Sequence, residues 1–210
     1  MEDRYYIKVC GLTDPQNIKK IVDLGVDFIG LIFYPESKRY VGDFVDANYI
    51  KSLTGRVNKV GVYVNEDIET VYEDVEDMDL QYVQLHGEET PAYCAKVKKV
   101  AKVIKAFGID AKFDFEKLKK YEKDVNWFLF DTKTSDYGGS GQKFDWKLLK
   151  KYKLKKPVII SGGISLDDAI QIKKLPYKFV KAVDLNSKFE EEPGIKDVDM
   201  VYTFMEYLKA

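Results

Sequence analysis

Three segments in the second half of the chain contain the residue types that acid–base chemistry on a phosphorylated molecule requires. An apolar run ends in a carboxylate at Phe128-Leu-Phe-Asp131, and a glycine-rich stretch follows at Gly138-Gly-Ser-Gly141. A second apolar run breaks into paired glycines at Val158-Ile-Ile-Ser161-Gly162-Gly163. Short apolar runs bounded by turn residues are typical of buried parallel strands. Glycines just after a strand let backbone N–H groups approach an anion closely, so we predict a phosphate site with an acid nearby.

Asp131 and Cys10 are the candidate proton-transfer groups. Asp131 directly follows Phe128-Leu-Phe, so we expect a partly desolvated carboxyl whose raised pKa keeps it protonated as an acid. The alternative interpretation is an aspartate that only caps a helix or stabilises a turn. Cys10 ends an early apolar run and precedes Gly11, which suits a reactive thiol. Cysteine is equally suited to be a small buried apolar residue.

Arg39 and His86 are further candidates. The planar guanidinium of Arg39 matches a carboxylate, which suggests a carboxylate-bearing substrate, although Arg39 also fits a surface position. His86 is the single histidine, and at a strand end it suits either a base or a structural hydrogen bond. Cys10, His86 and Cys94 do not have metal-ligand spacing, so we predict no metal.

Composition narrows the class of protein. The chain has 210 residues, of which 45% are hydrophobic and 33% charged, as expected of one globular domain over residues 1–210. A net charge of -1 does not favour binding to nucleic acid or to a membrane surface. Two cysteines are too few for a disulfide framework, and we see neither a secretory signal nor an 18-residue apolar run. We therefore expect a cytoplasmic protein.

Strand-like and helix-like segments alternate eight times along the chain. Asp14 and Pro15 predict the start of the first helix, and Gly25 predicts its end. Such alternation in so short a chain favours a closed (β/α)8 TIM barrel over an open sheet. The expected strands are 6–10, 28–33, 59–64, 82–85, 101–107, 127–131, 158–161 and 179–185. The other expected helices are 47–53, 68–76, 91–98, 113–121, 146–152, 167–175 and 198–208.

In a (β/α)8 barrel, functional residues lie at the carboxyl ends of the strands. The predicted strand ends bring one thiol, one guanidinium, one carboxylate and two potential phosphate loops to one mouth. They belong to Cys10, Arg39, Asp131, the Ser161-Gly162-Gly163 turn and the segment Asp184-Leu-Asn186-Ser187-Lys188.

A set of motifs along nearly the whole chain resembles the phosphoribosylanthranilate isomerase family of tryptophan biosynthesis. The motifs are Lys8-Val-Cys10-Gly-Leu-Thr13, Tyr34-Pro-Glu-Ser-Lys-Arg39-Tyr40, Val83-Gln-Leu-His86-Gly87, Asp131 with Gly138–Gly141 and Phe144-Asp-Trp146, Ser161-Gly-Gly-Ile164, and Gly194-Ile-Lys-Asp197. The resemblance implies a barrel of the ribulose-phosphate-binding type. It also implies the Amadori rearrangement of N-(5-phosphoribosyl)anthranilate to 1-(2-carboxyphenylamino)-1-deoxyribulose 5-phosphate, without a cofactor.

The resemblance also implies a role for each matching residue. Cys10 corresponds to the general base, Asp131 to the general acid, and Arg39 to the arginine that holds the anthranilate part. The phosphate is expected near Ser161, Gly162, Gly163, Asn186, Ser187 and Lys188, and the predicted substrate-binding set also includes Gly139 and Asp184. We expect a small phosphorylated substrate as the partner, and a monomer or homodimer.

One segment departs from the family pattern. After the eighth strand the family has serine followed by glycine, whereas this chain has Asn186-Ser187-Lys188. Lys188 either stays within ordinary backbone angles or alters the phosphate site, where its ammonium can contact the anion.

Two other functions remain open. One alternative is the aldose–ketose isomerase of histidine biosynthesis, but that reaction predicts two phosphate sites, and we find glycine-rich segments in one half of the chain. The other is a catalytically inactive barrel that serves as a binding or assembly subunit.

Overall fold

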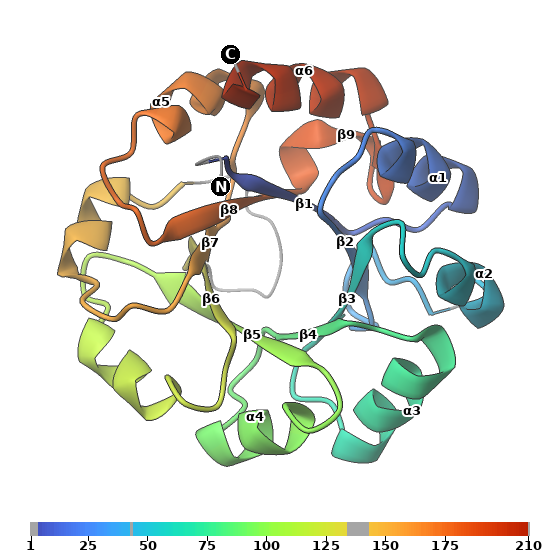
Figure 1. The fold of residues 1–210 in the computed structure, drawn as a ribbon, viewed down its shortest axis with the longest axis horizontal. Helices are drawn as coiled ribbons and strands as arrows, with labels where there is room; N and C mark the ends of the chain where they lie inside the picture. Colours follow the sequence, from blue (N-terminus) through green and yellow to red (C-terminus); the bar gives the residue numbers. More distant parts are fainter. Residues whose placement is uncertain (1–3, 43, 134–142, 210) are drawn as a thin grey trace.

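The computed structural model describes residues 4–42, 44–133 and 143–209, and its strands form a closed parallel barrel (Figure 1). Each strand pairs in parallel with the next, and β1 closes the ring against β8. The predicted (β/α)8 barrel is therefore confirmed. The strands are β1 (Tyr6–Cys10), β2 (Phe28–Ile32), β3 (Asn58–Tyr63), β4 (Tyr82–Leu85), β5 (Lys102–Ile109), β6 (Trp127–Thr132), β7 (Val158–Ile160) and β8 (Val180–Leu185).

Helices surround the barrel and connect its strands (Figure 1). The Asp14 side chain accepts a hydrogen bond from Asn17 N, Pro15 is the first helical residue, and Gly25 follows the helix end with a φ of +79°, as predicted. The helices are α1 (Pro15–Asp23), α2 (Ala47–Ser52), α3 (Ile68–Met78), α4 (Pro91–Val97), α5 (Ala169–Lys173) and α6 (Val198–Lys209), with short 3₁₀ helices η1 (Phe115–Lys120), η2 (Trp146–Lys151), η3 (Leu166–Asp168) and η4 (Ser187–Phe189).

Two of the expected α-helices are short 3₁₀ helices, each with two buried side chains three residues apart. In η1 the buried side chains are Phe115 and Leu118, and in η2 they are Trp146 and Leu149. A spacing of three residues matches the 3.0 residues per turn of a 3₁₀ helix, so one row of side chains faces the barrel. The expected helix over 167–175 likewise divides into η3 and α5.

Alternation along the strands separates two hydrophobic clusters. On β6, Leu129 belongs to the cluster that fills the barrel, whereas Phe128 and Phe130 belong to the larger cluster between strands and helices. Successive strand residues point to opposite faces, so residues two apart share the barrel interior. This alternation directs Lys8 and Cys10 on β1, and Leu129 and Asp131 on β6, inward.

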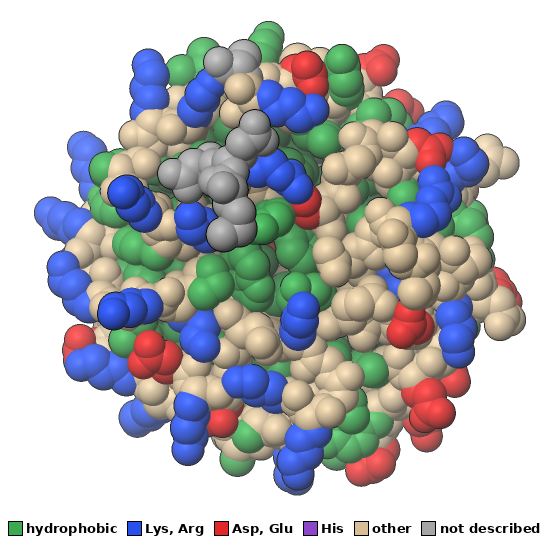
Figure 2. All heavy atoms as spheres, in the orientation of Figure 1, with side chains coloured by type: hydrophobic (Ala, Val, Ile, Leu, Met, Phe, Trp, Pro, Cys, Tyr) green, Lys and Arg blue, Asp and Glu red, His purple; other side chains and the backbone are tan. Residues whose placement is uncertain are grey.

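A short hairpin outside the barrel was not predicted. It pairs β9 (Glu190–Glu192) with β10 (Ile195–Lys196) in antiparallel fashion. Figure 2 shows the molecule in the orientation of Figure 1, with hydrophobic side chains gathered in the middle of this face and a rim of Lys and Arg with Asp and Glu among them. No helix among the described residues is both long and apolar enough to cross a bilayer.

Candidate active site

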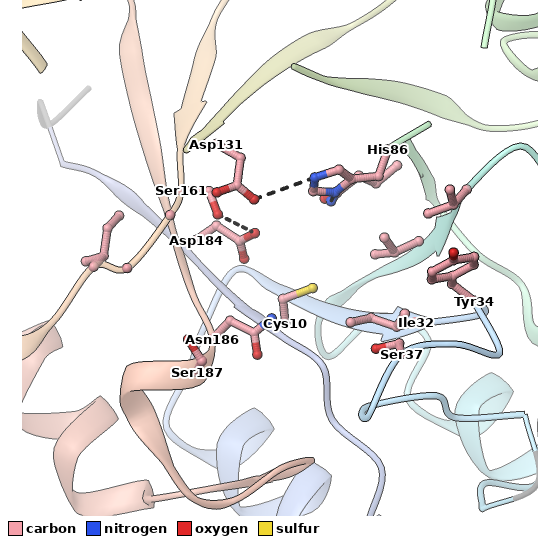
Figure 3. A pocket seen from close by; sticks show the side chains of 16 residues that line it. Cys10, Ile32, Tyr34, Ser37, His86, Asp131, Ser161, Asp184, Asn186 and Ser187 are labelled. Atoms are coloured by element: carbon pink, nitrogen blue, oxygen red, sulfur yellow. Dashed lines mark hydrogen bonds and ion pairs between the residues drawn. The ribbon is translucent and has the colours of Figure 1, made fainter. Parts of the chain in front are cut away.

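A pocket opens at the carboxyl ends of the strands, and several of the predicted residues line it (Figure 3). Cys10 ends β1, Asp131 lies near the end of β6, and Ser161 directly follows β7. Their side chains point into one space, although they are far apart in the sequence. The lining consists of Cys10, Ile32, Tyr34, Ser37, Val62, Val64, Gln84, His86, Asp131, Ser161, Gly162, Gly163, Ile164, Asp184, Asn186 and Ser187.

Asp131 is held as a weak acid in this pocket. Burial raises the pKa of its carboxyl to about 6. A hydrogen bond from the backbone N–H of Thr132 to Oδ1, at 2.7 Å, lowers the pKa but does not cancel the effect of burial. The other oxygen, Oδ2, lies 3.5 Å from His86 Nε2. Gly162 packs closely against the acid: a Cβ added at this position would lie 2.6 Å from Asp131 Oδ1. The site can therefore offer a proton near neutral pH.

Cys10 is a buried thiol surrounded by charged groups. Burial raises the pKa of the thiol, while the ammonium groups of Lys8 and Lys196 oppose this effect. Gly30 on the neighbouring strand leaves room for the sulfur, because a Cβ there would lie 2.6 Å from Sγ. Only the thiolate can accept a proton, so Cys10 can act as a base only in the small fraction of protein molecules in which it is ionised.

A buried ion pair lies below the pocket. Lys8 Nζ donates to both carboxylate oxygens of Asp184 at 3.0 Å, and Ser161 Oγ lies 3.4 Å from Asp184 Oδ2. Burial lowers the pKa of Lys8, but the charges and hydrogen bonds of Asp184 and Cys10 together outweigh burial, so the net pKa is raised and the ammonium is retained. A positive charge is thus fixed inside the barrel, on the strand that carries Cys10.

Arg39 is engaged by the hairpin. Its Nε and Nη2 donate to the two carboxylate oxygens of Glu190, both at 2.7 Å, and Lys196 Nζ also donates to Glu190. Among the described residues, Arg39 Nη1 has no hydrogen-bond acceptor. The Arg39 side chain packs beside Gly11, where an added Cβ would lie 2.6 Å from Cδ. Arg39 therefore lies near Cys10 and retains donors, although it is not among the lining residues.

The turn after β7 presents backbone donors to the pocket. Gly162 and Gly163 have φ values of +89° and +61°, which only glycine adopts without strain. Among the turn and loop hydrogen bonds of the described residues, none is donated by the N–H of Gly162, Gly163 or Ser187. Consecutive left-handed residues with open N–H groups form a concave site suited to an anion.

The pocket brings together eight of the predicted site residues: Cys10, Asp131, Ser161, Gly162, Gly163, Asp184, Asn186 and Ser187. Lys188 is exposed and, like Arg39, lies outside the lining; its φ is not in the left-handed region. Gly139 and the Gly138–Gly141 stretch lie outside the described residues. Sequence reasoning missed Gln84, which lines the pocket, and Glu190, which holds Arg39.

The fold and this site together define a (β/α)8-barrel enzyme whose candidate acid and base share one pocket. The family model described as N-(5'-phosphoribosyl)anthranilate (PRA) isomerase matches residues 7–207. The chain belongs to this family.

Relatives and solved structures agree with the family model. The N-(5'-phosphoribosyl)anthranilate isomerase of Parabacteroides distasonis is 43% identical over 204 residues, which cover 96% of this chain and 92% of the relative. The crystal structure of phosphoribosyl anthranilate isomerase from Thermotoga maritima has a TM-score of 0.83 and 33% identity, and covers 98% of both chains. A further structure of such an isomerase, in complex with reduced 1-(o-carboxyphenylamino)-1-deoxyribulose 5-phosphate, has a TM-score of 0.79 and 30% identity over 98% of both chains.

Proposed function

We propose that this chain isomerises N-(5-phosphoribosyl)anthranilate to 1-(2-carboxyphenylamino)-1-deoxyribulose 5-phosphate in tryptophan biosynthesis, with Asp131 as general acid and Cys10 as general base. The observation that carries the proposal is that both side chains point into one pocket beside a turn with open glycine N–H groups. Membership of the isomerase family supports the same reaction.

The reaction needs one proton donor and one proton acceptor. Asp131 gives its proton to the furanose ring oxygen as the bond from that oxygen to C1 breaks, which leaves a Schiff base. Cys10 then removes the proton from C2, and the product is an enolamine. The enolamine gains a proton at C1 and loses the proton of its C2 hydroxyl, which gives the ketone. Asp131 ends as a carboxylate and Cys10 as a thiol, so the protons balance.

The remaining pocket groups bind the two ends of the substrate. The open N–H groups of Gly162, Gly163 and Ser187 suit the phosphate, and Asn186 and Ser161 lie beside them. Lys188 adds a positive charge on the same loop. Nη1 of Arg39, which has no acceptor among the described residues, suits the anthranilate carboxylate, because a guanidinium fixed by Glu190 can bind a second carboxylate without further ordering.

Substrate turnover tests this proposal directly. The fluorescence of phosphoribosylanthranilate is expected to decay when the purified protein is added. Replacing Cys10 by Ser or Asp131 by Asn is expected to lower kcat by about 100- to 10,000-fold, which is the usual contribution of one general acid or base.

A second cysteine provides the matched control. Cys94 lies on α4 in the outer hydrophobic cluster and does not line the pocket, so Cys94→Ser is expected to keep the parent kcat. A parent protein without turnover would refute the function. An active parent with equally active Cys10→Ser and Asp131→Asn variants would refute the two roles.

Three broader expectations belong to the same proposal. We propose one barrel domain over residues 1–210, a monomer or homodimer, and a cytoplasmic location. Two free cysteines support a reducing compartment. A sedimentation measurement of the purified chain would decide between monomer and dimer.

A further inference from the structure

A row of three side chains leads from the barrel interior to the candidate acid. Gln84 is on β4, and His86 is two residues further along the same face. Gln84 Nε2 lies 3.0 Å from His86 Nδ1. On the other side of the ring, His86 Nε2 lies 3.5 Å from Asp131 Oδ2 (Figure 3). The imidazole thus stands between a neutral amide and the carboxyl group.

The amide decides which nitrogen of the imidazole carries the proton. With the amide oriented as in this structure, Nε2 of Gln84 faces the ring and can only donate, so Nδ1 of His86 accepts and the ring proton is on Nε2, facing Asp131. Burial, followed by the charges of Lys105 and Lys8, lowers the pKa of His86 to about 3, so the ring stays neutral. A neutral ring with its proton on Nε2 is a donor aimed at Asp131.

The loop that carries His86 is fixed by a buried ion pair. Lys105 Nζ donates to the backbone oxygens of Leu85 and Gly87, at 3.1 Å and 2.8 Å, on either side of His86. Glu89 lies 3.1 Å from Lys105 Nζ and accepts the N–H of Gly87. These contacts leave the imidazole little freedom except rotation, which the Gln84 contact restricts.

We propose that Gln84 and His86 are positioning residues for Asp131: Gln84 fixes the His86 tautomer, and His86 stabilises the carboxylate that Asp131 becomes after it has given up its proton. The inference rests on the proposed role of Asp131 as the acid. Gln84 is 1% exposed, and its Oε1 has no hydrogen-bond partner among the described residues. The one polar contact of its side chain is therefore the one to His86.

The charged groups that face this row come from four other strands. They are Asp131 on β6, Lys105 on β5, Lys8 and Cys10 on β1, and Asp184 on β8. Both lysines oppose a proton on His86. Because His86 remains neutral across the working pH range, loss of the Gln84 contact is expected to change the tautomer rather than the charge of the ring.

Nitrogen-15 NMR of the imidazole tests the tautomer. Its signals need no assignment to a residue because His86 is the single histidine of the chain, and couplings to the ring C–H protons distinguish Nδ1 from Nε2. Between pH 5 and pH 8 the parent is expected to show a protonated Nε2 and an unprotonated Nδ1. In Gln84→Glu the new carboxylate can only accept, so Nδ1 is expected to carry a proton. A parent with the proton on Nδ1, or with both nitrogens protonated at pH 7, would overturn the proposal.

Kinetics provide the second measurement. Gln84→Met, which has a similar length and no donor, is expected to lower kcat by about 10- to 100-fold with KM changed by less than about threefold. Gln171→Glu, on the exposed face of α5, makes the same chemical change as Gln84→Glu and is expected to keep the parent kcat. Unchanged kcat in both Gln84 variants would refute the positioning role. An inactive parent with the expected tautomer would refute the proposed function instead.

Discussion

Lys8 Nζ donates to both carboxylate oxygens of Asp184 at 3.0 Å, and neither side chain is exposed by more than 5%. The pair joins the first and last strands of the barrel, since Lys8 and Asp184 are also partners in the β1–β8 register. Two opposite charges buried side by side neutralise each other, but each is costly when the other is removed. The pair therefore links closure of the barrel to the electrostatics of Cys10.

We predict that Lys8→Met lowers the free energy of unfolding by about 3–5 kcal/mol at pH 7, because Asp184 is left as an unpaired buried charge. The loss is expected to shrink at pH 4, where Asp184 takes up a proton in the variant. Urea denaturation at both pH values measures it. The double variant Lys8→Met with Asp184→Asn removes both charges and is expected to recover stability; no recovery would contradict the argument.

The pH dependence of kcat/KM follows from the two raised pKa values. Burial raises the pKa of Asp131 to about 6 and raises that of the Cys10 thiol above its ordinary value. Between these values the prevailing form has a carboxylate and a thiol, and the reactive form with the proton on Asp131 is a constant minor fraction. We therefore predict a plateau in kcat/KM from about pH 6 to the thiol pKa.

We expect kcat/KM to fall on both sides of this plateau. Below pH 6 both groups are protonated, so kcat/KM is expected to fall about tenfold per pH unit. Above the thiol pKa both groups are ionised, and kcat/KM is expected to fall again. Initial rates from pH 4.5 to pH 10 in buffers of constant ionic strength measure the profile. A decline that begins near pH 6 and continues upward would mean that the thiol is already ionised, contrary to its burial.

The barrel could be predicted because its boundaries are set by local chemistry. Asp14, Pro15 and Gly25 determine the ends of α1 by capping and backbone preference, which are properties of a few adjacent residues. The hairpin that begins at Glu190 could not be predicted, because three consecutive glutamates do not show the alternation typical of a strand. Its first residue, Glu190, is held by Lys196 on β10 and by Arg39, which lies 151 residues away in the sequence.

The same distinction applies to the site. Cys10 and Asp131 end apolar runs, so their place at the mouth follows from the strand pattern alone. Gln84 lies within the buried strand Tyr82–Leu85, both faces of which are covered, so alternation gives no polar face to identify it. The contact between Gln84 and His86 depends on side-chain geometry, which the sequence pattern does not specify.

Asp131→Asn is expected to make the protein more stable and less active. A buried carboxyl whose folded pKa is about 6 binds its proton more tightly than in the unfolded chain, so its burial costs stability as pH rises from about 4 to 6. The Asp131 side chain is 24% exposed, which limits solvent screening. We predict a gain of up to about 3 kcal/mol at pH 7.5 and little gain at pH 4. Equal gains at both pH values, measured by urea denaturation, would contradict this linkage.

The contact between Gly162 and Asp131 can be isolated with a matched pair of glycine substitutions. Gly162 and Gly25 have φ values of +89° and +79°, so alanine at either position costs about 1–2 kcal/mol in backbone strain. An added Cβ has no atom within 4 Å at Gly25, whereas at Gly162 it would lie 2.5 Å from Thr132 Oγ1 and 2.6 Å from Asp131 Oδ1. Gly25→Ala is therefore expected to lower the free energy of unfolding and keep the parent kcat.

Gly162→Ala is expected to lower stability by more than Gly25→Ala and also to lower kcat, because the new methyl group must displace the carboxyl of Asp131. Displacement of the acid by about 1 Å is enough to reduce turnover by about 100-fold. Urea denaturation and substrate fluorescence on the two variants separate the effects. If both variants kept the parent kcat, Asp131 would have moved without consequence, and its role as the acid would have to be given to another group.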